Sequence, residues 1–427
     1  MKKPQQIAAL AAIIASPTFA NPIDQIRPDA PELAAYGDFF VGVQTLELSN
    51  PAQIDVLSVT DSETPVYDRP LTVEVWYPTA DQTPTRGSYT ATLRDGTTQV
   101  TLTGRAMRDA RPLEGDRFPL VVVSHGYPGN RYLMSHLCEN LASKGYVAVS
   151  IDHTDSTYSD QAAFGSTLLN RPLDQQFVVD YMSTLDTPLG QITNANMTAV
   201  IGYSMGGYGA LVFGGAGVTQ ASTEYSWGTP HGLLARHLAG SESHEAIVDP
   251  RVRAIIAIGP WGRNAGFWDI AGMSGLRKPT MIMAGGSDDV SVYEAIRTIF
   301  DEATNAERHL LTFENANHNA AAPMPAPKES WQPSDTLDFV PFEHYADPVW
   351  DSVRMNNIAQ HFATAFLDIH LKAQTSRRAF LELLPNSSDG VIALDEDGIP
   401  TEDHTYWAGF GPRTAKGLRF ETRAKGE

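Results

Sequence analysis

The sequence predicts an α/β fold, with a mostly parallel central sheet flanked by helices and interrupted by insertions. Short apolar runs of strand length recur along the chain and alternate with segments of helical periodicity, which is typical of repeated βαβ steps. Turn-forming and polar residues follow several of these runs directly. Because open α/β sheets place their sites beyond the carboxyl ends of their strands, these turns are where we look for chemistry.

The central stretch of the chain is MTAVIGYSMGGYGALVF at residues 197–213, which contains the pattern G-x-S-x-G. An apolar strand is expected before this pattern, and a helix of small residues is expected after it. A tight strand-to-helix turn lifts a serine hydroxyl above the sheet, and glycines leave room for neighbouring backbone. The pattern also occurs in ordinary Gly/Ser turns, but its flanking elements favour a nucleophile elbow at Ser204.

A serine nucleophile needs a base to take its proton and an acid to orient that base. Strands expected at 279–284 and 309–313 are followed by the loops GGSDD and ENANHN. The second loop supplies His318 as the candidate base. The first supplies Asp288 and Asp289 as candidate acids, and Asp269, after the preceding strand, is a more distant alternative.

The expected strand at 118–124 ends in the glycine-bearing loop HGYPGN. A loop in this position supplies one backbone donor of an oxyanion hole, and the residue after the nucleophile supplies the other. Pro128 has no N–H, so we expect the backbone N–H groups of Tyr127 and Met205 to form the oxyanion hole. We expect His125 to brace the loop rather than to catalyse.

Two features after the elbow are candidates for substrate binding. Residues 217–249 interrupt the βα alternation with polar and Gly-rich sequence, so this insertion is a candidate lid, with a passive surface loop as the alternative. The strand expected at 252–258 ends in GPWG, which places an aromatic side chain at a strand end. We therefore expect Trp261 to line an apolar acyl pocket.

Residues 1–20 have the organisation of a secretory signal peptide. Lys2 and Lys3 precede an apolar run at 7–15, and Thr18 and Ala20 provide small residues for cleavage. We therefore expect an exported protein, periplasmic or extracellular, whose remaining residues 21–427 form one domain with a C-terminal extension at 381–427. No later apolar run is long enough for a membrane span, so stable membrane insertion is not expected.

Composition narrows the possible partners. The 427-residue chain is 42% hydrophobic and carries a formal net charge of −19, which disfavours binding to nucleic acid and to anionic membranes. The single cysteine, Cys138, cannot form an intramolecular disulfide, and we expect it to be a buried structural thiol. Asp152 and His153 are adjacent but too few for a metal site, so no metal is expected. The oligomeric state is left open.

The remaining segments predict the strands and helices that support the site. Strands are expected at 40–48 and 71–77, followed by a hairpin at 89–104 around the turn pair Asp95-Gly96, which we interpret as an insertion at the sheet edge. Helices are expected at 133–144, 173–185 and 350–372, and a long ordered loop rich in Pro and Ala at 319–348.

Five separated segments, in order, carry a resemblance to a known family. They are LTVEVWYP (71–78), VSHGYPGNR (123–131), LASKGYVAVSIDH (141–153), RPLDQQFVVD (171–180) and IGYSMGG (201–207). The chain resembles the bacterial α/β-hydrolases related to platelet-activating factor acetylhydrolase, often labelled predicted dienelactone hydrolases. The resemblance covers roughly residues 42–318.

This resemblance implies an α/β-hydrolase fold and a serine carboxylic-ester hydrolase without a cofactor, with Ser204, Asp288 and His318 as its triad. In the family the acid stands a few residues past the strand-ending glycine, before one variable and one apolar residue, and this spacing selects Asp288. Dienelactone hydrolases themselves use a cysteine nucleophile, which this elbow lacks, and Tyr203 stands where many relatives have histidine.

The function we expect is hydrolysis of short-acyl esters, including acetylated lipids (a role in lipid degradation) or polyester fragments, through an acyl-enzyme. The substrate is thus a small-molecule or polymeric ester. Two alternatives remain open at this stage: an acyltransferase whose pocket favours an alcohol over water, and a non-catalytic binding protein built on a hydrolase fold.

Overall fold

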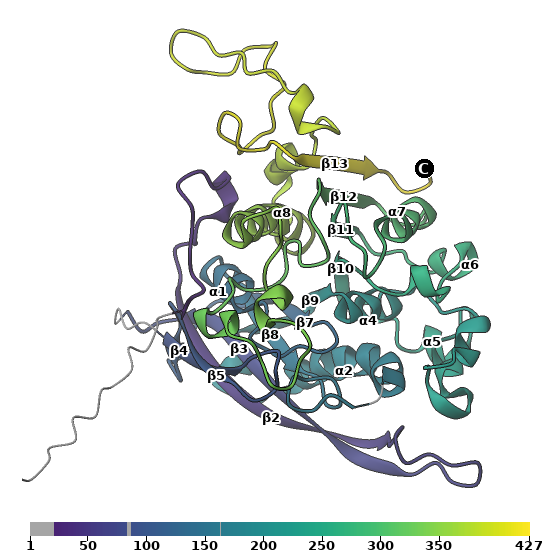
Figure 1. Cartoon of the computed structure of the whole chain (residues 1–427). Coiled ribbons are helices and arrows are strands. Elements are labelled where there is room, and N and C mark those ends of the chain that lie inside the picture. The colour runs from purple at the N-terminus through teal and green to yellow at the C-terminus, as the bar shows by residue number, and fades with distance from the viewer. Residues whose placement is uncertain (1–20, 83–86, 163) are drawn as a thin grey trace, which may run out of the picture.

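The computed structural model describes residues 21–82, 87–162 and 164–427. The expected signal peptide, residues 1–20, lies outside the described residues. Within the described residues, a ten-stranded sheet crosses the middle of the molecule in the order β13-β12-β11-β10-β9-β7-β8-β3-β2-β6 (Figure 1). Its strands are β2 (Phe40–Ile54), β3 (Val66–Thr79), β6 (Met107–Arg108), β7 (Phe118–Ser124), β8 (Val147–Asp152), β9 (Thr193–Tyr203), β10 (Val252–Ile258), β11 (Thr280–Gly285), β12 (Arg308–Phe313) and β13 (Leu418–Arg423).

The six central strands, from β12 to β8, pair in parallel, whereas β3 and β2 continue the sheet in antiparallel pairing. At the other edge β13 pairs antiparallel with β12, so the C-terminal extension contributes a strand to the sheet. A mostly parallel sheet covered by helices confirms the fold class predicted from the alternation of apolar runs.

The helices cover both faces of the sheet. The main ones are α1 (Ser135–Ser143), α2 (Phe164–Thr184), α4 (Met205–Phe213), α7 (Tyr293–Glu302) and α8 (Ser352–Lys372), and shorter ones are α3 (Pro188–Ile192), α5 (Glu242–Glu245) and α6 (Ile270–Met273). Val121 and Val123 of β7 belong to one apolar cluster with α1 and α8. Leu120 and Val122 belong to the other, with α2, α4 and α7. Alternate residues of a strand point to opposite faces, which is why the buried strands are apolar throughout.

A small second sheet lies beside the main one. The predicted hairpin forms β4 (Gly87–Thr92) and β5 (Gln99–Gly104), and β1 (Asn21–Pro22) pairs with β5. The buried carboxylate of Glu139 on α1 accepts hydrogen bonds from the backbone N–H groups of Arg105 and Ala106 and from the Tyr89 hydroxyl. The hairpin is therefore fastened to the helical layer and does not hang free at the sheet edge.

The insertion at 217–249 packs on the helices of one face. It contains the 3-10 turns η2 (Ala221–Glu224) and η3 (Pro230–His237) and the short helix α5. The Nε2 atom of His237 lies 2.8 Å from the carbonyl oxygen of Leu169 in α2. The Nε2 atom of His244 lies 3.0 Å from the carbonyl oxygen of Val212 in α4. These contacts hold the insertion against α2 and α4.

Candidate active site

Ser204 occupies a strained turn between β9 and α4. Its φ of 53° and ψ of −113° are unfavourable for a residue with a side chain, at a cost of about 1–3 kcal/mol. A Cβ added to Gly202 would lie 2.0 Å from the Gly206 carbonyl oxygen, and one added to Gly206 would lie 2.0 Å from that of Ser124. Both glycines of the elbow are therefore required by close backbone approach, as the sequence pattern predicts.

His318 and Asp288 meet beside this turn. The Nδ1 atom of His318 lies 2.8 Å from Oδ2 of Asp288, whose side chain is buried. The other carboxylate oxygen, Oδ1, accepts hydrogen bonds from the backbone N–H groups of Val290 and Ser291 at 3.0 and 2.9 Å. Because two fixed donors occupy Oδ1, Oδ2 is held toward the imidazole.

The other two acids lie elsewhere. Asp289 is exposed at the rim of the cavity described below. It does not cap α7, because the N-cap of that helix is Val292 and no side chain bonds there. Asp269 accepts a hydrogen bond at 2.8 Å from the Gly272 N–H and so caps α6. Of the three candidate acids, only Asp288 contacts His318.

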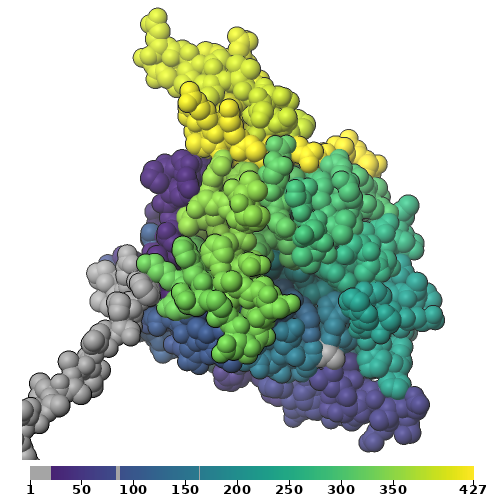
Figure 2. Space-filling model, in the orientation of Figure 1, coloured from purple at the N-terminus to yellow at the C-terminus, as the bar shows by residue number. Residues whose placement is uncertain are grey.

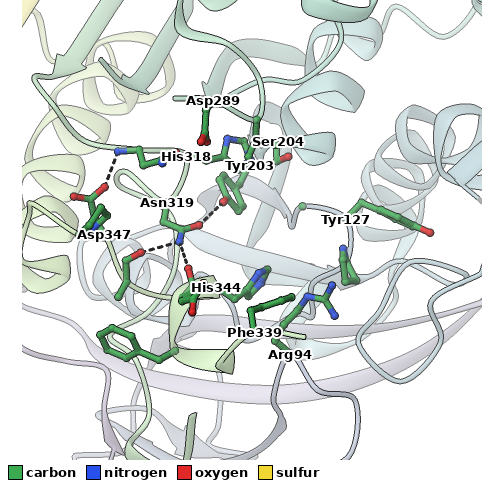
Figure 3. Close-up of a pocket in the computed structure, with 18 residues that line it drawn as sticks. Arg94, Tyr127, Tyr203, Ser204, Asp289, His318, Asn319, Phe339, His344 and Asp347 are labelled. Atoms are coloured by element: carbon green, nitrogen blue, oxygen red, sulfur yellow. Dashed lines mark hydrogen bonds between the residues drawn. The ribbon is translucent and has the colours of Figure 1, made fainter. Parts of the chain in front are cut away.

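Tyr203 packs directly against the base. Its ring centroid lies 5.2 Å from that of His318, with the two ring planes inclined by 35°. Its hydroxyl donates at 3.1 Å to Oδ1 of Asn319, and the Asn319 amide donates to the carbonyl oxygens of Glu343 and Ala346, each at 2.8 Å. The elbow, the histidine loop and the 343–346 segment are thereby joined (Figure 3).

The loop after β7 lies against the nucleophile. A Cβ added to Gly126 would come within 3.2 Å of Ser204 Cβ. Among the residues that the structure describes, neither the Tyr127 N–H nor the Met205 N–H has a hydrogen-bond acceptor. Two unpaired donors beside a serine are what an oxyanion hole requires.

Buried side chains hold the loop after β7 in place. Arg171 of α2 donates to the His125 carbonyl oxygen at 2.6 Å and to that of Gly126 at 3.2 Å. Burial, together with the nearby Arg171 charge, lowers the pKa of His125 well below its usual value, so its ring stays neutral. His125 therefore supports the loop, as expected from the sequence.

His153 belongs to a second, fully buried group. Its Nε2 lies 2.8 Å from Ser124 Oγ and its Nδ1 lies 2.9 Å from Asp174, which also binds Arg69 at 2.9 Å. The residue types match a Ser-His-acid triad, but these side chains have no access to solvent. The neighbouring Asp152 is bound to Arg131. In the described parts of the chain, no group of three or more His, Cys, Asp or Glu side chains is arranged to hold a metal ion.

Ser204 and His318 open into a cavity of about 640 Å³. The segment around 320–350, light green in Figure 2, lies over the front of the molecule beside this hollow. The lining comes from the hairpin turn, the loop after β7, the elbow, the two loops with the acid and the base, and the 339–348 segment. The lining residues are Arg94, Gly126, Tyr127, Pro128, Tyr203, Ser204, Asp289, Val290, Asn317, His318, Asn319, Phe339, Phe342, Glu343, His344, Ala346, Asp347 and Pro348.

Trp261 is not among the residues that line this cavity, which differs from expectation, and no residue of the 217–249 insertion is among them either. The backbone N–H of Trp261 does bond the Ser204 carbonyl oxygen at 3.3 Å, but its ring packs against Phe164, Tyr225 and Phe267, with centroids 5.1–6.3 Å apart. These aromatic partners come from α2 (Phe164), the insertion (Tyr225) and the loop after β10 (Phe267). The role of the insertion, lid or passive surface loop, stays a prediction.

Sequence inspection missed the residues that form the far wall. Asp347 fixes the histidine loop by accepting the Asn317 N–H at 2.6 Å, while its other oxygen accepts those of Val349 and Trp350. Arg94 reaches the cavity from the β4–β5 turn. The sequence offered one indication of this wall, because the loop at 319–348 follows His318 immediately and so begins at the site.

Three comparisons relate the chain to known proteins. The family described as platelet-activating factor acetylhydrolase, isoform II, matches residues 87–178. Cutinase est1 of Thermobifida alba is 25% identical over 211 residues, which cover 49% of this chain and 56% of that cutinase. Cutinase 2 of Thermobifida cellulosilytica is 26% identical over 211 residues, which cover 49% of this chain and 63% of that protein. The chain thus spans less than two thirds of the length of these cutinases.

A solved ferulic acid esterase from Streptomyces cinnamoneus has a TM-score of 0.55 and 20% identity, covering 83% of this chain and 94% of that one. Together with the sheet order, this likeness confirms the α/β-hydrolase fold. The described residues include no helix that is both long enough and apolar enough to cross a membrane.

Proposed function

We propose that the chain is an exported serine carboxylic-ester hydrolase that acts on short-acyl esters through an acyl-enzyme. One observation carries the proposal. His318 and Ser204 line the same cavity, His318 lies 2.8 Å from the buried Asp288, and Ser204 stands on a strained turn. The matches to cutinases and to the acetylhydrolase family support ester hydrolysis.

In the proposed reaction, His318 takes the proton from the Ser204 hydroxyl as the serine oxygen attacks the ester carbonyl. The Asp288 carboxylate holds the imidazole in the productive tautomer and stabilises its protonated form. The N–H groups of Tyr127 and Met205 bind the developing oxyanion, each worth about 3 kcal/mol. His318 then protonates the leaving alcohol, and water attacks the acyl-enzyme by the same steps.

The test is to assay p-nitrophenyl esters of increasing acyl length, with and without an added alcohol acceptor, and to label the protein with a fluorophosphonate. We expect labelling of Ser204 alone, and Ser204→Ala should lose about three to six orders of magnitude in kcat. Ser124→Ala is the matched control, because Ser124 has a histidine and an acid beside it but no access to the cavity.

Labelling should persist in Ser124→Ala. Esterase activity retained by Ser204→Ala would point to another nucleophile. Faster transfer to the alcohol than to water would make the protein an acyltransferase instead.

Export is a separate part of the proposal and rests on residues 1–20. We expect the mature protein to begin at Asn21, and N-terminal sequencing of protein from its native host measures this. A chain that still begins at Met1 would contradict export through this signal.

A further inference from the structure

Arg94 is the single Arg or Lys among the described residues that line the cavity. It projects from the β4–β5 turn, across the cavity from Ser204, and lies beside Phe339 (Figure 3). Its guanidinium carbon lies 5.5 Å from the Phe339 ring centroid. An arginine held over an aromatic face keeps its N–H donors, which lie in the guanidinium plane, free for other partners.

Within the described residues, no carboxylate forms an ion pair with Arg94. The adjacent Asp95 is already occupied, because it accepts the N–H groups of Thr97 and Thr98 and the Thr98 hydroxyl. Asp347 is likewise occupied by backbone donors. The two other lining acids, Asp289 and Glu343, are exposed and form no ion pair with it. A half-buried guanidinium therefore faces the cavity without an ion pair to any carboxylate that the structure describes.

The backbone around Arg94 is fixed on three sides. Its N–H donates to the Tyr345 hydroxyl at 3.0 Å, and the Thr336 hydroxyl donates to the Asp95 carbonyl oxygen at 2.8 Å. Asn130, in the loop after β7, donates to the Thr92 carbonyl oxygen at 2.9 Å. The turn is thus tied both to the far wall and to the loop beside the nucleophile.

The charges around Arg94 differ from its own. The lining His344 is neutral, because burial and the nearby Arg94 charge lower its pKa to about 3. The whole chain carries a formal charge of −19, so its overall field repels anions. A local cation is then needed if an anionic substrate is to be held beside Ser204.

From this arrangement we propose that Arg94 binds a carboxylate carried by the substrate away from the scissile ester. The planar guanidinium suits a carboxylate, to which it donates two parallel hydrogen bonds. The site would prefer half-esters of dicarboxylic acids and carboxyl-ended polyester fragments over neutral esters of the same length. This inference rests on the proposed ester hydrolysis at Ser204.

The test compares mono-(4-nitrophenyl) adipate with 4-nitrophenyl hexanoate, which have acyl chains of equal length and differ in the terminal carboxylate. A second pair, 3-acetoxybenzoate and its methyl ester, places the carboxylate on the alcohol side. Uncatalysed hydrolysis is subtracted for each ester. The variants are Arg94→Gln, Arg94→Lys and, as a control for lost charge outside the cavity, Arg263→Gln, whose arginine pairs with Glu302.

In the wild-type protein we expect the anionic member of at least one pair to have the higher kcat/KM, by a margin that shrinks as salt rises. Arg94→Gln should lower kcat/KM for that anionic ester about 10- to 100-fold, mainly through KM, and change the neutral ester less than 2-fold. Arg94→Lys should retain part of the preference, and Arg263→Gln all of it.

Equal losses on anionic and neutral esters would assign Arg94 a structural role and overturn the proposal, as would an unchanged preference in Arg94→Gln. Absence of Ser204-dependent hydrolysis of all four esters would instead contradict the proposed function itself.

Discussion

At the residue scale, Asp288 and Asp289 are chemically identical neighbours with different surroundings. Asp288 is buried, contacts His318 through one oxygen and accepts two backbone N–H groups through the other. Asp289 is exposed and provides no cap for α7. Successive residues leaving a strand project to different sides, so only one of the pair can face the imidazole.

We therefore predict that Asp288→Asn lowers kcat by about 10⁴, because an amide stabilises the wrong histidine tautomer and cannot stabilise the imidazolium. Asp289→Asn, the matched control, should leave both kcat and the melting temperature close to wild type. Kinetics and thermal melting of the two variants provide the measurement. An activity loss confined to Asp289→Asn would shift the assignment by one residue, and a loss in neither would place the acid in another loop.

The candidate site was predictable from sequence where the signal is local. The glycines of the elbow and the polar loops after β11 and β12 mark the places where side chains can reach above the sheet. The residues alone left Asp288 and Asp289 as alternatives, and only the spacing of the resembled family selected Asp288, because the choice depends on which carboxylate meets the N–H groups of Val290 and Ser291 after folding. The role of each residue in catalysis stays a prediction until the variants are measured.

At the element scale, the buried strands were predicted best. The limits of β7 and β10 coincide with the predicted runs at 118–124 and 252–258, because continuous apolar sequence bounded by polar turns has few other solutions. β13 was missed, since an edge strand with alternating polar residues near the end of the chain has a weak pattern.

The walls of the cavity could not be predicted, because long-range contacts form them. The N–H of Arg94 bonds the hydroxyl of Tyr345, 251 residues away in sequence. The hairpin at 89–104 was recognised from its Asp95-Gly96 turn, yet nothing local indicated that this turn reaches the active-site cavity. Conversely, Trp261 follows a strand end, but its aromatic neighbours come from α2 and from the insertion.

At the scale of the whole molecule, several histidines are buried and do not line the cavity. His136 of α1, His237 of η3 and His361 of α8 are almost inaccessible to solvent. Burial lowers the pKa of His136 and His361 to about 3 and that of His237 to about 4, from an ordinary value of 6.5. Each ring is therefore neutral in the folded protein at pH values where the unfolded chain would bind a proton.

This difference makes stability depend on pH in a definite direction. Above pH 6.5 neither state protonates these rings, and their contribution to stability is fully present. As the pH falls from 6.5 toward about 3–4, only the unfolded chain takes up the protons, so each histidine removes up to about 1.4 kcal/mol of unfolding free energy per pH unit. We expect the protein to unfold progressively more easily below pH 6.5.

The prediction is tested by urea unfolding at several pH values from 7.5 to 4.5 in the wild type, His136→Gln and Leu137→Ala. His136 is suitable because its Nδ1 has no hydrogen-bond partner, so its replacement breaks no bond at that atom. Leu137 is buried on the same helix and does not titrate, so Leu137→Ala is the control for a loss of stability without a loss of a proton site. At pH 5 the slope of unfolding free energy against pH gives the protons taken up on unfolding. That number should fall by about one in His136→Gln and stay unchanged in Leu137→Ala. If His136→Gln keeps the wild-type slope, the ring is already protonated in the folded protein, and its burial is not what weakens the protein in acid.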